Sequence, residues 1–121
     1  MNPVDSIPRA ILVVTHGGVG AELVALAKDL LGLAQGLESI SMTSRDSLET
    51  LAAKMEKWAA RIPARTRRIV LTDLKNSSAT VSALALSKQF PLDCICGVNL
   101  PMLLKSLSQS DLSLDDIVSA G

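Results

Sequence analysis

The chain has 121 residues, enough for one domain with a single hydrophobic core. Its 12 basic and 12 acidic side chains cancel, and only 2% of its residues are aromatic, so it has neither the charge nor the stacking surface of a nucleic-acid-binding protein. No apolar stretch approaches the roughly 20 residues of a membrane span, and the first residues lack the features of a signal peptide. We therefore expect one cytoplasmic domain over 1–121, without nucleic acid and without direct membrane insertion.

The beginning of the chain predicts a buried strand followed by a helix. The segment 10–15 (A-I-L-V-V-T) is continuously apolar and is closed by glycines, which is typical of a strand with both faces buried. From Leu23 to Ala34 apolar residues then recur at helical spacing. Gly32 and Gly36, near the end of that pattern, are stop signals for the helix.

A second strand and a second helix follow. Residues 37–42 are the strand candidate, and the helix after it has Asp46 or Ser44 as its expected N-cap. The apolar positions of this helix are Leu48, Leu51, Ala52, Met55 and Ala59. Their spacing of i, i+3, i+4, i+7 and i+11 predicts an amphipathic helix. We expect Trp58, which adjoins this stripe, to be partly buried.

The second half of the chain repeats the alternation. A third buried strand is expected at 69–72, and the polar stretch 75–78 leads into a third helix. The residues that mark this helix are Val81, Leu84 and Ala85. A fourth strand is expected at 92–98. Two short helices are expected, one with Pro101 at its first position and continuing to Leu107, and one after the cap at Ser113.

Two groups of side chains, a set of arginines and a pair of cysteines, are expected to take no part in catalysis. The arginines of segment 61–68 precede the third strand, at the end of the sheet opposite His16, and we expect them to be solvated. Cys94 and Cys96 stand at i and i+2 in an apolar run, where a disulfide between them would be strained. One histidine and two thiols are also a poor ligand set for a metal. We therefore expect reduced thiols in the core, no metal site and no cofactor.

The alternation of strands and helices predicts an α/β fold, an open and mainly parallel sheet with helices on both faces. The flavodoxin-like strand order 2-1-3-4 is the natural candidate for a chain of this length. In such sheets ligands bind beyond the carboxyl ends of the strands, where the order reverses, between the first and third strands. The first strand ends at His16 and the third at Asp73, so both residues would face one crevice.

The residues at this crevice suit phosphoryl transfer. An imidazole nitrogen of His16 is a good nucleophile toward phosphorus, and the carboxylate of Asp73 would fix its tautomer. Gly17 and Gly18 lack side chains, so their amides can approach a phosphoryl group at a helix N-terminus, and Ser78 could donate a further hydrogen bond. On pattern alone, a single histidine after a buried strand is also typical of a structural residue or a bystander. The stretch H-G-G-V-G has no Walker lysine after it, which disfavours a nucleotide or flavin site.

Three segments carry a family resemblance. They are I-L-V-V-T-H-G-G-V-G-A-E-L at 11–23, V-L-T-D-L at 70–74 and G-V-N-L-P-M-L at 97–103. In order and spacing they resemble the mannose-type enzyme IIA domains of the bacterial phosphoenolpyruvate-dependent sugar phosphotransferase system (PTS). The resemblance implies the flavodoxin-like fold and a phosphotransferase component that works through a phosphohistidine intermediate.

The resemblance also implies roles for individual residues. His16 matches the histidine that accepts a phosphoryl group from the carrier HPr and passes it to a IIB domain. Asp73 matches the aspartate that pairs with this histidine, and Ser78 falls on the position of a hydroxyl beside the phosphate. The partners implied are therefore proteins, HPr and a IIB domain.

Two departures from the family pattern qualify these expectations. After the aspartate, family members usually have an aromatic residue, two glycines, Ser or Thr, and proline, whereas this chain has K-N-S-S-A at 75–79. That change favours a regulatory role in an incomplete pathway, or a protein-binding module that has lost transfer. The family's usual last strand, often exchanged in a homodimer, is expected to be missing or truncated, which weakens the expectation of a homodimer.

Overall fold

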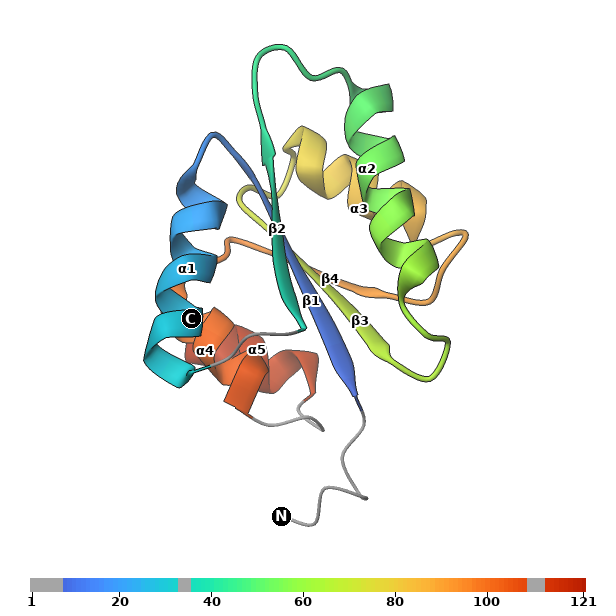
Figure 1. Ribbon diagram of the computed structural model, residues 1–121. Helices are drawn as coiled ribbons and strands as arrows, with labels where there is room; N and C mark the ends of the chain where they lie inside the picture. The colour runs from blue at the N-terminus through green and yellow to red at the C-terminus, as the bar shows by residue number, and fades with distance from the viewer. Residues whose placement is uncertain (1–7, 33–35, 109–112) are drawn as a thin grey trace.

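Four parallel strands form an open sheet in the order β2-β1-β3-β4 in the computed structural model, which describes residues 8–32, 36–108 and 113–121 (Figure 1). The elements in chain order are β1 (Arg9–His16), α1 (Val19–Leu31), β2 (Leu37–Met42), α2 (Leu48–Arg61), β3 (Arg67–Thr72), α3 (Ser78–Leu86), β4 (Asp93–Cys96), α4 (Leu100–Ser108) and α5 (Leu114–Ala120). The predicted α/β class and the predicted order 2-1-3-4 are both confirmed. Each expected strand and helix is present, although the fourth strand is shorter than 92–98.

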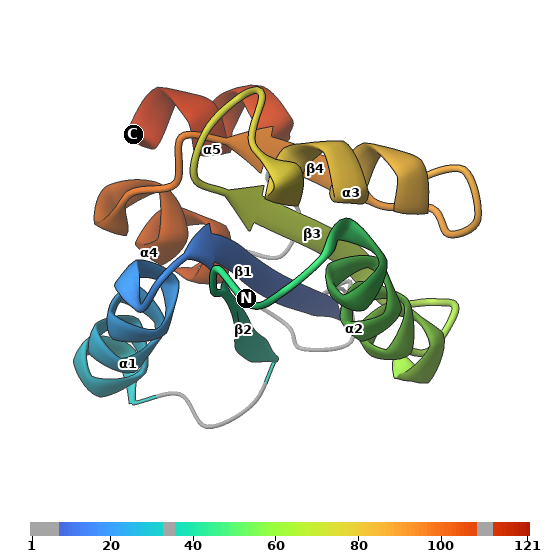
Figure 2. The ribbon, with the colours of Figure 1, turned by 90° about the horizontal axis from the view of Figure 1, so that it is seen from above.

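The sheet separates two hydrophobic layers. On one face Ile11 and Val13 of β1 pack with α1, α4 and α5. On the other face Leu12 and Val14 pack with α2 and α3. Figure 2, seen from above, shows these two groups of helices on opposite sides of the strands. The central strand β1 is therefore buried on both faces, as its continuous apolar run predicted.

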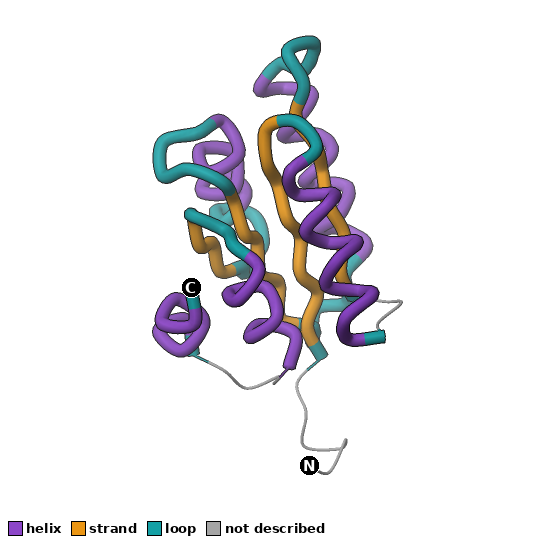
Figure 3. The backbone as a smooth tube through the Cα atoms, turned by 90° about the vertical axis from the view of Figure 1, so that its left-hand side faces the viewer, coloured by secondary structure: helices purple, strands orange, loops and turns teal. Residues whose placement is uncertain are grey.

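The carboxyl ends of the four strands meet at one end of the molecule because all the strand pairs are parallel. Figure 3 shows the loops that follow the strands gathered toward the upper end of the sheet. Adjacent strands β1 and β3 lie in register from Arg9 opposite Arg67 to Val14 opposite Thr72. The residues that follow these two strands are thereby brought side by side.

Burial on the helices departs from the apolar stripes read in the sequence. In α1 the buried side chains are Val24 and Ala27, whereas Leu30, near the C-terminus, is exposed. The helix stops at Gly32, which has a φ of 65°, as predicted, while Ala34 lies outside the described residues. Trp58 is only 2% exposed, so the expectation of partial burial was wrong, because its ring points into the layer between α2 and the sheet.

Helix α3 buries a face of small residues. Ala79 and Ala83 have no exposed surface, whereas Val81 and Leu84, two of the residues that mark the helix in the sequence, are more than half exposed. Alanines allow a helix to approach its neighbours closely, and α3 packs beside α2 over the sheet (Figure 1).

The N-cap of α2 is Ser47, so the expected caps Asp46 and Ser44 were wrong. The Ser47 hydroxyl accepts from the amide of Thr50 at 3.1 Å. Asp46 stands one residue too early for this role, and its carboxylate instead accepts from the amide of Thr43 at 2.8 Å and closes the preceding turn. Ser44 lies in that same turn.

The arginines of segment 61–68 are not all solvated, which corrects the sequence-based expectation. Arg68 is buried and donates to the carbonyls of Ala59 at 3.2 Å and Ile62 at 3.0 Å. Its guanidinium also lies 5.3 Å from the centre of the Phe90 ring. It thereby satisfies carbonyls at the C-terminal end of α2, whereas Arg65 remains exposed.

The two cysteines carry free thiols and are half-buried. Cys94 packs against the layer formed with α2 and α3, as expected for a core residue. Burial is the main cause that raises the pKa of the Cys94 thiol. Among the described residues, no helix combines the length and the apolar character needed to cross a membrane.

Candidate functional site at the carboxyl ends of β1 and β3

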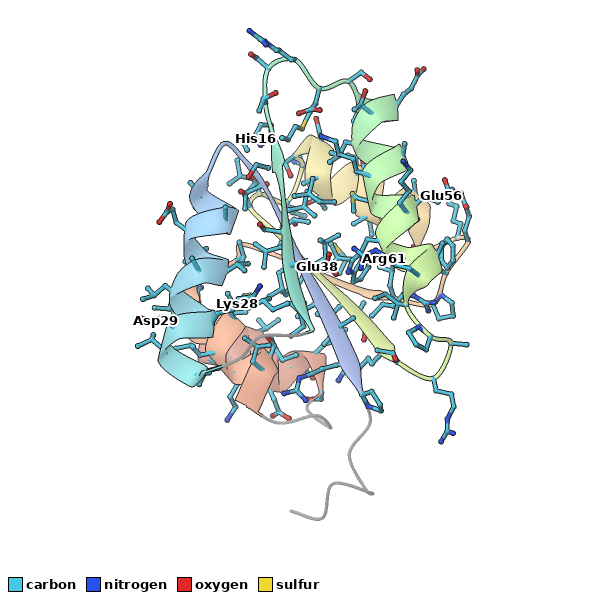
Figure 4. The ribbon with its side chains drawn as sticks, viewed as in Figure 1. His16, Lys28, Asp29, Glu38, Glu56 and Arg61 are labelled. Carbon is cyan, nitrogen blue, oxygen red and sulfur yellow. The ribbon has the colours of Figure 1, made fainter. Side chains whose placement is uncertain are left out.

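His16 and Asp73 meet where the strand order reverses. His16 is the last residue of β1, and Asp73 directly follows β3. The Nδ1 atom of His16 lies 2.9 Å from Oδ2 of Asp73, and the same oxygen accepts from the backbone amide of His16 at 2.9 Å. The predicted convergence of these two side chains is therefore present, at the upper end of β1 in Figure 4.

Hydrogen bonds hold the Asp73 carboxylate in its ionised form. Its side chain is 20% exposed, and its second oxygen accepts from the amide of Leu74 at 2.8 Å. Burial taken alone would raise the pKa of Asp73, but hydrogen bonds from His16, Ser77 and Leu74 outweigh it and lower the pKa to about 2. The carboxylate is charged at neutral pH and can act only as an acceptor.

The charge on Asp73 fixes the tautomer of His16. Because a carboxylate has no proton to donate, Nδ1 of His16 carries the proton of their shared hydrogen bond. In the neutral ring, Nε2 then keeps its lone pair. The His16 side chain is 56% exposed, so this nitrogen belongs to a ring that an incoming group can reach. The pair thus presents an oriented nucleophile at the surface.

The glycines after His16 shape the turn in different ways. Gly17 has a φ of 61°, and its amide donates to the carbonyl of Met42 at 2.8 Å, so this amide is not available to a ligand. Gly18 is the N-cap of α1 and has no side chain to cap the helix. Within the part of the chain that the structure describes, its amide and that of Val19 have no acceptor. The N-terminus of α1 therefore offers unpaired donors next to His16.

Gly20, in the first turn of α1, is required by close packing. Its amide donates to the Oγ1 atom of Thr15 at 2.8 Å. A Cβ atom on Gly20 would lie 2.8 Å from that same oxygen and 3.1 Å from Val13. This glycine thus brings the start of α1 down onto the end of β1.

Ser77 and Ser78 lie where α3 begins, and the sequence predicted a hydrogen bond only for Ser78, to the phosphoryl group. Ser77 is buried and caps α3 by accepting from the amide of Thr80 at 3.2 Å, and its hydroxyl helps to lower the pKa of Asp73. Ser78 is the first residue of α3 and is half-buried. Its hydroxyl has no hydrogen-bond partner among the residues placed by the structure, so it stays available at the end of the helix.

A buried polar network below Asp73, also missed in the sequence, fixes the loop between β3 and α3. The Thr80 hydroxyl lies 2.6 Å from that of Thr72 and 2.6 Å from the carbonyl of Leu74. The only sequence signal for this network is the pairing of Ser77 and Thr80 at cap spacing. These contacts anchor the loop on both sides of Asp73, and hence the carboxylate that orients His16.

Exposed apolar side chains flank the histidine. Val19, at the start of α1, is 61% exposed, and Leu74, directly after Asp73, is 67% exposed. Lys75 follows Leu74 and is exposed as well. An apolar surface beside a reactive group is typical of a protein contact.

Comparison with known proteins assigns the chain to a family. Residues 10–120 match the family of the PTS system fructose IIA component. The chain belongs to this family. It is 29% identical, over 91% of its length, to the mannose-specific EIIAB component of the PTS from Escherichia coli strain K12, and it spans 35% of that relative.

Solved structures agree with the fold of this IIA-type chain. The PTS IIA protein associated with the fucose utilization operon from Streptococcus pneumoniae superposes with a TM-score of 0.84 at 23% identity, over 94% of this chain and 88% of the other. A sigma-54 interaction domain protein from Enterococcus faecalis superposes with a TM-score of 0.77 at 16% identity, over 95% of this chain and 88% of the other. At these identities the likeness concerns the fold alone.

Proposed function

We propose that this PTS IIA-type component is a phosphocarrier that accepts a phosphoryl group from phosphorylated HPr on His16 and passes it to a IIB domain. The observation that carries the proposal is the contact of His16 Nδ1 with the ionised Asp73, which leaves Nε2 as the free nucleophile. Membership of the IIA family supports it. In this role the protein works in the cytoplasm.

The proposed transfer forms one bond and breaks one bond. The lone pair on Nε2 of His16 attacks the phosphorus, and the bond from phosphorus to the donor's nitrogen breaks, with its electron pair returning to the donor. The proton on Nδ1 stays in place, so the phosphorylated ring carries a positive charge that the Asp73 carboxylate stabilises at 2.9 Å. The reverse sequence delivers the group to the IIB domain.

Two helix N-termini are suited to hold the transferred group. The unpaired amides of Gly18 and Val19 begin α1, and the free hydroxyl of Ser78 begins α3. The N-terminus of a helix favours negative charge through its exposed N–H groups and its dipole. In this proposal Gly18 and Ser78 bind phosphate oxygens, whereas Gly17 forms the turn that places them.

The surface around His16 supports a protein partner. Val19, the first residue of α1, and Leu74, directly after Asp73, are exposed, and so is Leu48, the first residue of α2. Helix α2 begins at the end of the sheet where β1 and β3 end (Figure 1). Burying apolar surface of this kind favours association with another protein.

A protein-binding regulatory module that does not transfer phosphate is the second candidate. The K-N-S-S-A sequence at 75–79 favours this second function, because this sequence replaces the loop that family members usually have next to Asp73. The same fold occurs in the sigma-54 interaction domain protein, which shows that proteins of other designations use this architecture.

One experiment distinguishes the two functions. The protein is incubated with labelled phosphoenolpyruvate, enzyme I and the HPr of its own source, and an acid-labile, base-stable phosphate is measured. We expect the wild type to be labelled and His16→Ala to remain unlabelled while folding normally. Absence of label on the wild type, with HPr itself phosphorylated, would contradict the carrier and favour the regulatory module.

A further inference from the structure

Helix α1 carries a second apolar stripe besides the one that packs on the sheet. The buried side of the helix contains Gly20, Val24 and Ala27. At about 3.6 residues per turn, four further apolar residues follow one another along an adjoining side. They are Val19, Leu23, Leu26 and Leu30, and we call them the α1 stripe. Leu23 is partly buried, whereas the other three are between 43% and 61% exposed. An exposed apolar stripe of this kind is typical of a surface that binds another molecule.

The α1 stripe begins close to His16 and borders an open hollow. The residues that line this hollow are Gly18, Val19, Glu22, Leu23 and Leu26. All five belong to α1 or its N-cap, so the hollow has one wall and does not enclose a small molecule. A broad surface, such as the face of another protein, is needed to cover it. Gly18 and Val19 also provide the unpaired amides proposed above to hold the phosphoryl group, so a protein seated here lies next to His16.

One edge of the α1 stripe is acidic. Glu22 and Asp29 are exposed and lie two turns apart, on the side of the stripe that faces away from the sheet. Figure 4 shows Asp29 on the outer side of α1. Neither carboxylate has an ion pair within residues 8–32, 36–108 and 113–121. A carboxylate in the last turn of a helix is unfavourable for the helix itself, so the stability of α1 does not explain Asp29.

The acidic edge favours a basic partner. A phosphoryl group is negatively charged, so Glu22 and Asp29 repel a protein that carries one toward His16. Lysine or arginine side chains on the docking face of that protein would pair with the two carboxylates and reverse the repulsion. A phosphorylated donor needs this compensation, whereas an acceptor without a phosphoryl group does not.

We propose that the α1 stripe is the docking surface for the protein that delivers the phosphoryl group to His16, and that this protein binds through a basic amphipathic helix. The inference rests on the carrier function proposed above. Apolar side chains of the donor's helix lie on Leu23, Leu26 and Leu30, as in other helix-in-groove complexes. Its basic side chains face Glu22 and Asp29. The stripe spans about 16 Å, so a donor helix of about three turns covers it.

The dependence of transfer on donor concentration tests the docking surface. Initial rates of transfer are measured over a range of phosphorylated HPr concentrations, which separates KM from kcat. Leu26→Gln removes apolar contact and should raise KM about fivefold. Glu22→Lys should raise KM about tenfold at low ionic strength and by less at high ionic strength, because salt screens the charges. In both variants kcat should change less than about twofold, because the contact between His16 and Asp73 is untouched.

Matched controls lie on the opposite face of the sheet, in α2 and α3. Leu84→Gln changes a leucine that is 56% exposed, and Glu56→Lys reverses the charge of an exposed glutamate that Figure 4 labels. Both variants should keep the KM of the wild type. Thermal unfolding shows that each variant is folded.

The proposal is overturned if folded Leu26→Gln or Glu22→Lys keeps the KM of the wild type, or if the controls raise KM equally. A dimer that Leu26→Gln dissociates in sedimentation, with KM unchanged, would make the stripe a contact between two copies and also overturn it. If the wild type takes up no label from phosphorylated HPr, the carrier function itself fails, and the docking surface fails with it. Normal labelling of the wild type with unaltered KM in the variants refutes the docking surface alone.

Discussion

Replacing Asp73 by asparagine tests the proposed role of the histidine pair. Asp73 accepts hydrogen bonds at both oxygens, from His16 at Oδ2 and from Leu74 at Oδ1. An asparagine has one acceptor oxygen and one NH₂ group, so in either orientation its NH₂ group faces an N–H donor. If it faces His16, the imidazole proton is driven to Nε2 and the nucleophile is lost.

The size of the effect follows from the pKa of Asp73. It lies at about 2, against an ordinary value of 3.8, and this difference corresponds to about 2.5 kcal/mol of preferential stabilisation of the charged carboxylate. Solvent around the partly exposed pair screens some of this energy, which leaves about 1 to 2 kcal/mol. If the carboxylate stabilises the positively charged phosphorylated ring to the same extent, transfer should slow by about 5- to 30-fold.

The assay is the initial rate of phosphoryl transfer from phosphorylated HPr, with thermal unfolding measured in parallel. Asp93→Asn is a matched control, because Asp93 also forms an ion pair, with Arg67 at 3.0 Å, but at the start of β4, remote from His16. It should cost a small amount of stability and leave the transfer rate unchanged. A folded Asp73→Asn protein that transfers at the wild-type rate would refute the orienting role of the carboxylate.

Three further changes probe the structure around the pair. Gly20→Ala should destabilise the protein by about 1–3 kcal/mol in denaturant unfolding, because the added Cβ would meet the stiff, buried side chain of Thr15. Gly18→Ala is the control. Because there is open space around Gly18, this substitution should change the free energy of unfolding by less than about 0.5 kcal/mol. Ser77→Ala should cost about 1 kcal/mol as a lost N-cap and raise the pKa of Asp73 toward its ordinary value, which a carboxyl NMR titration measures. Because the folded-state pKa of Asp73 is lowered, its contribution to stability is complete above about pH 4 and is lost as the pH falls toward 2. The Asp73→Asn variant should lack this component of acid destabilisation. An equal loss of unfolding free energy between about pH 4 and pH 2 in the wild type and the variant would contradict this prediction.

The sheet and the meeting of His16 with Asp73 could be predicted from the sequence for one physical reason. Continuously apolar runs separated by helical patterns imply parallel strands, and parallel strands bring their carboxyl ends to one edge. Once β1 and β3 are neighbours, the residues after them must lie close together. This inference needs only the order of the elements and tolerates errors of one or two residues at their ends.

Details that depend on a single residue position were less predictable. The N-cap of α3 is Ser77, and this position was not predictable because a cap depends on the residue at which the helix begins, which periodicity locates less sharply. The burial of Arg68 depends on which face of β3 it occupies and on carbonyls of a separate element, the end of α2. The same holds for the indole N–H of Trp58, whose lack of an acceptor among the described residues appears only when its whole surroundings are known.

The loop at 75–79 shows why a departure from a family pattern need not disrupt a site. Glycines are required where the backbone has a positive φ, and among the described residues only glycines do, at positions outside this loop. Ser77 has a φ of −72° and a ψ of 163°, ordinary values for an N-cap, so the K-N-S-S-A sequence closes the turn without a glycine. Its hydroxyl then helps to lower the pKa of Asp73, which a glycine at that position could not do. The substituted loop therefore keeps the carboxylate charged and positioned for His16, so its departure from the family pattern does not by itself argue against the proposed carrier.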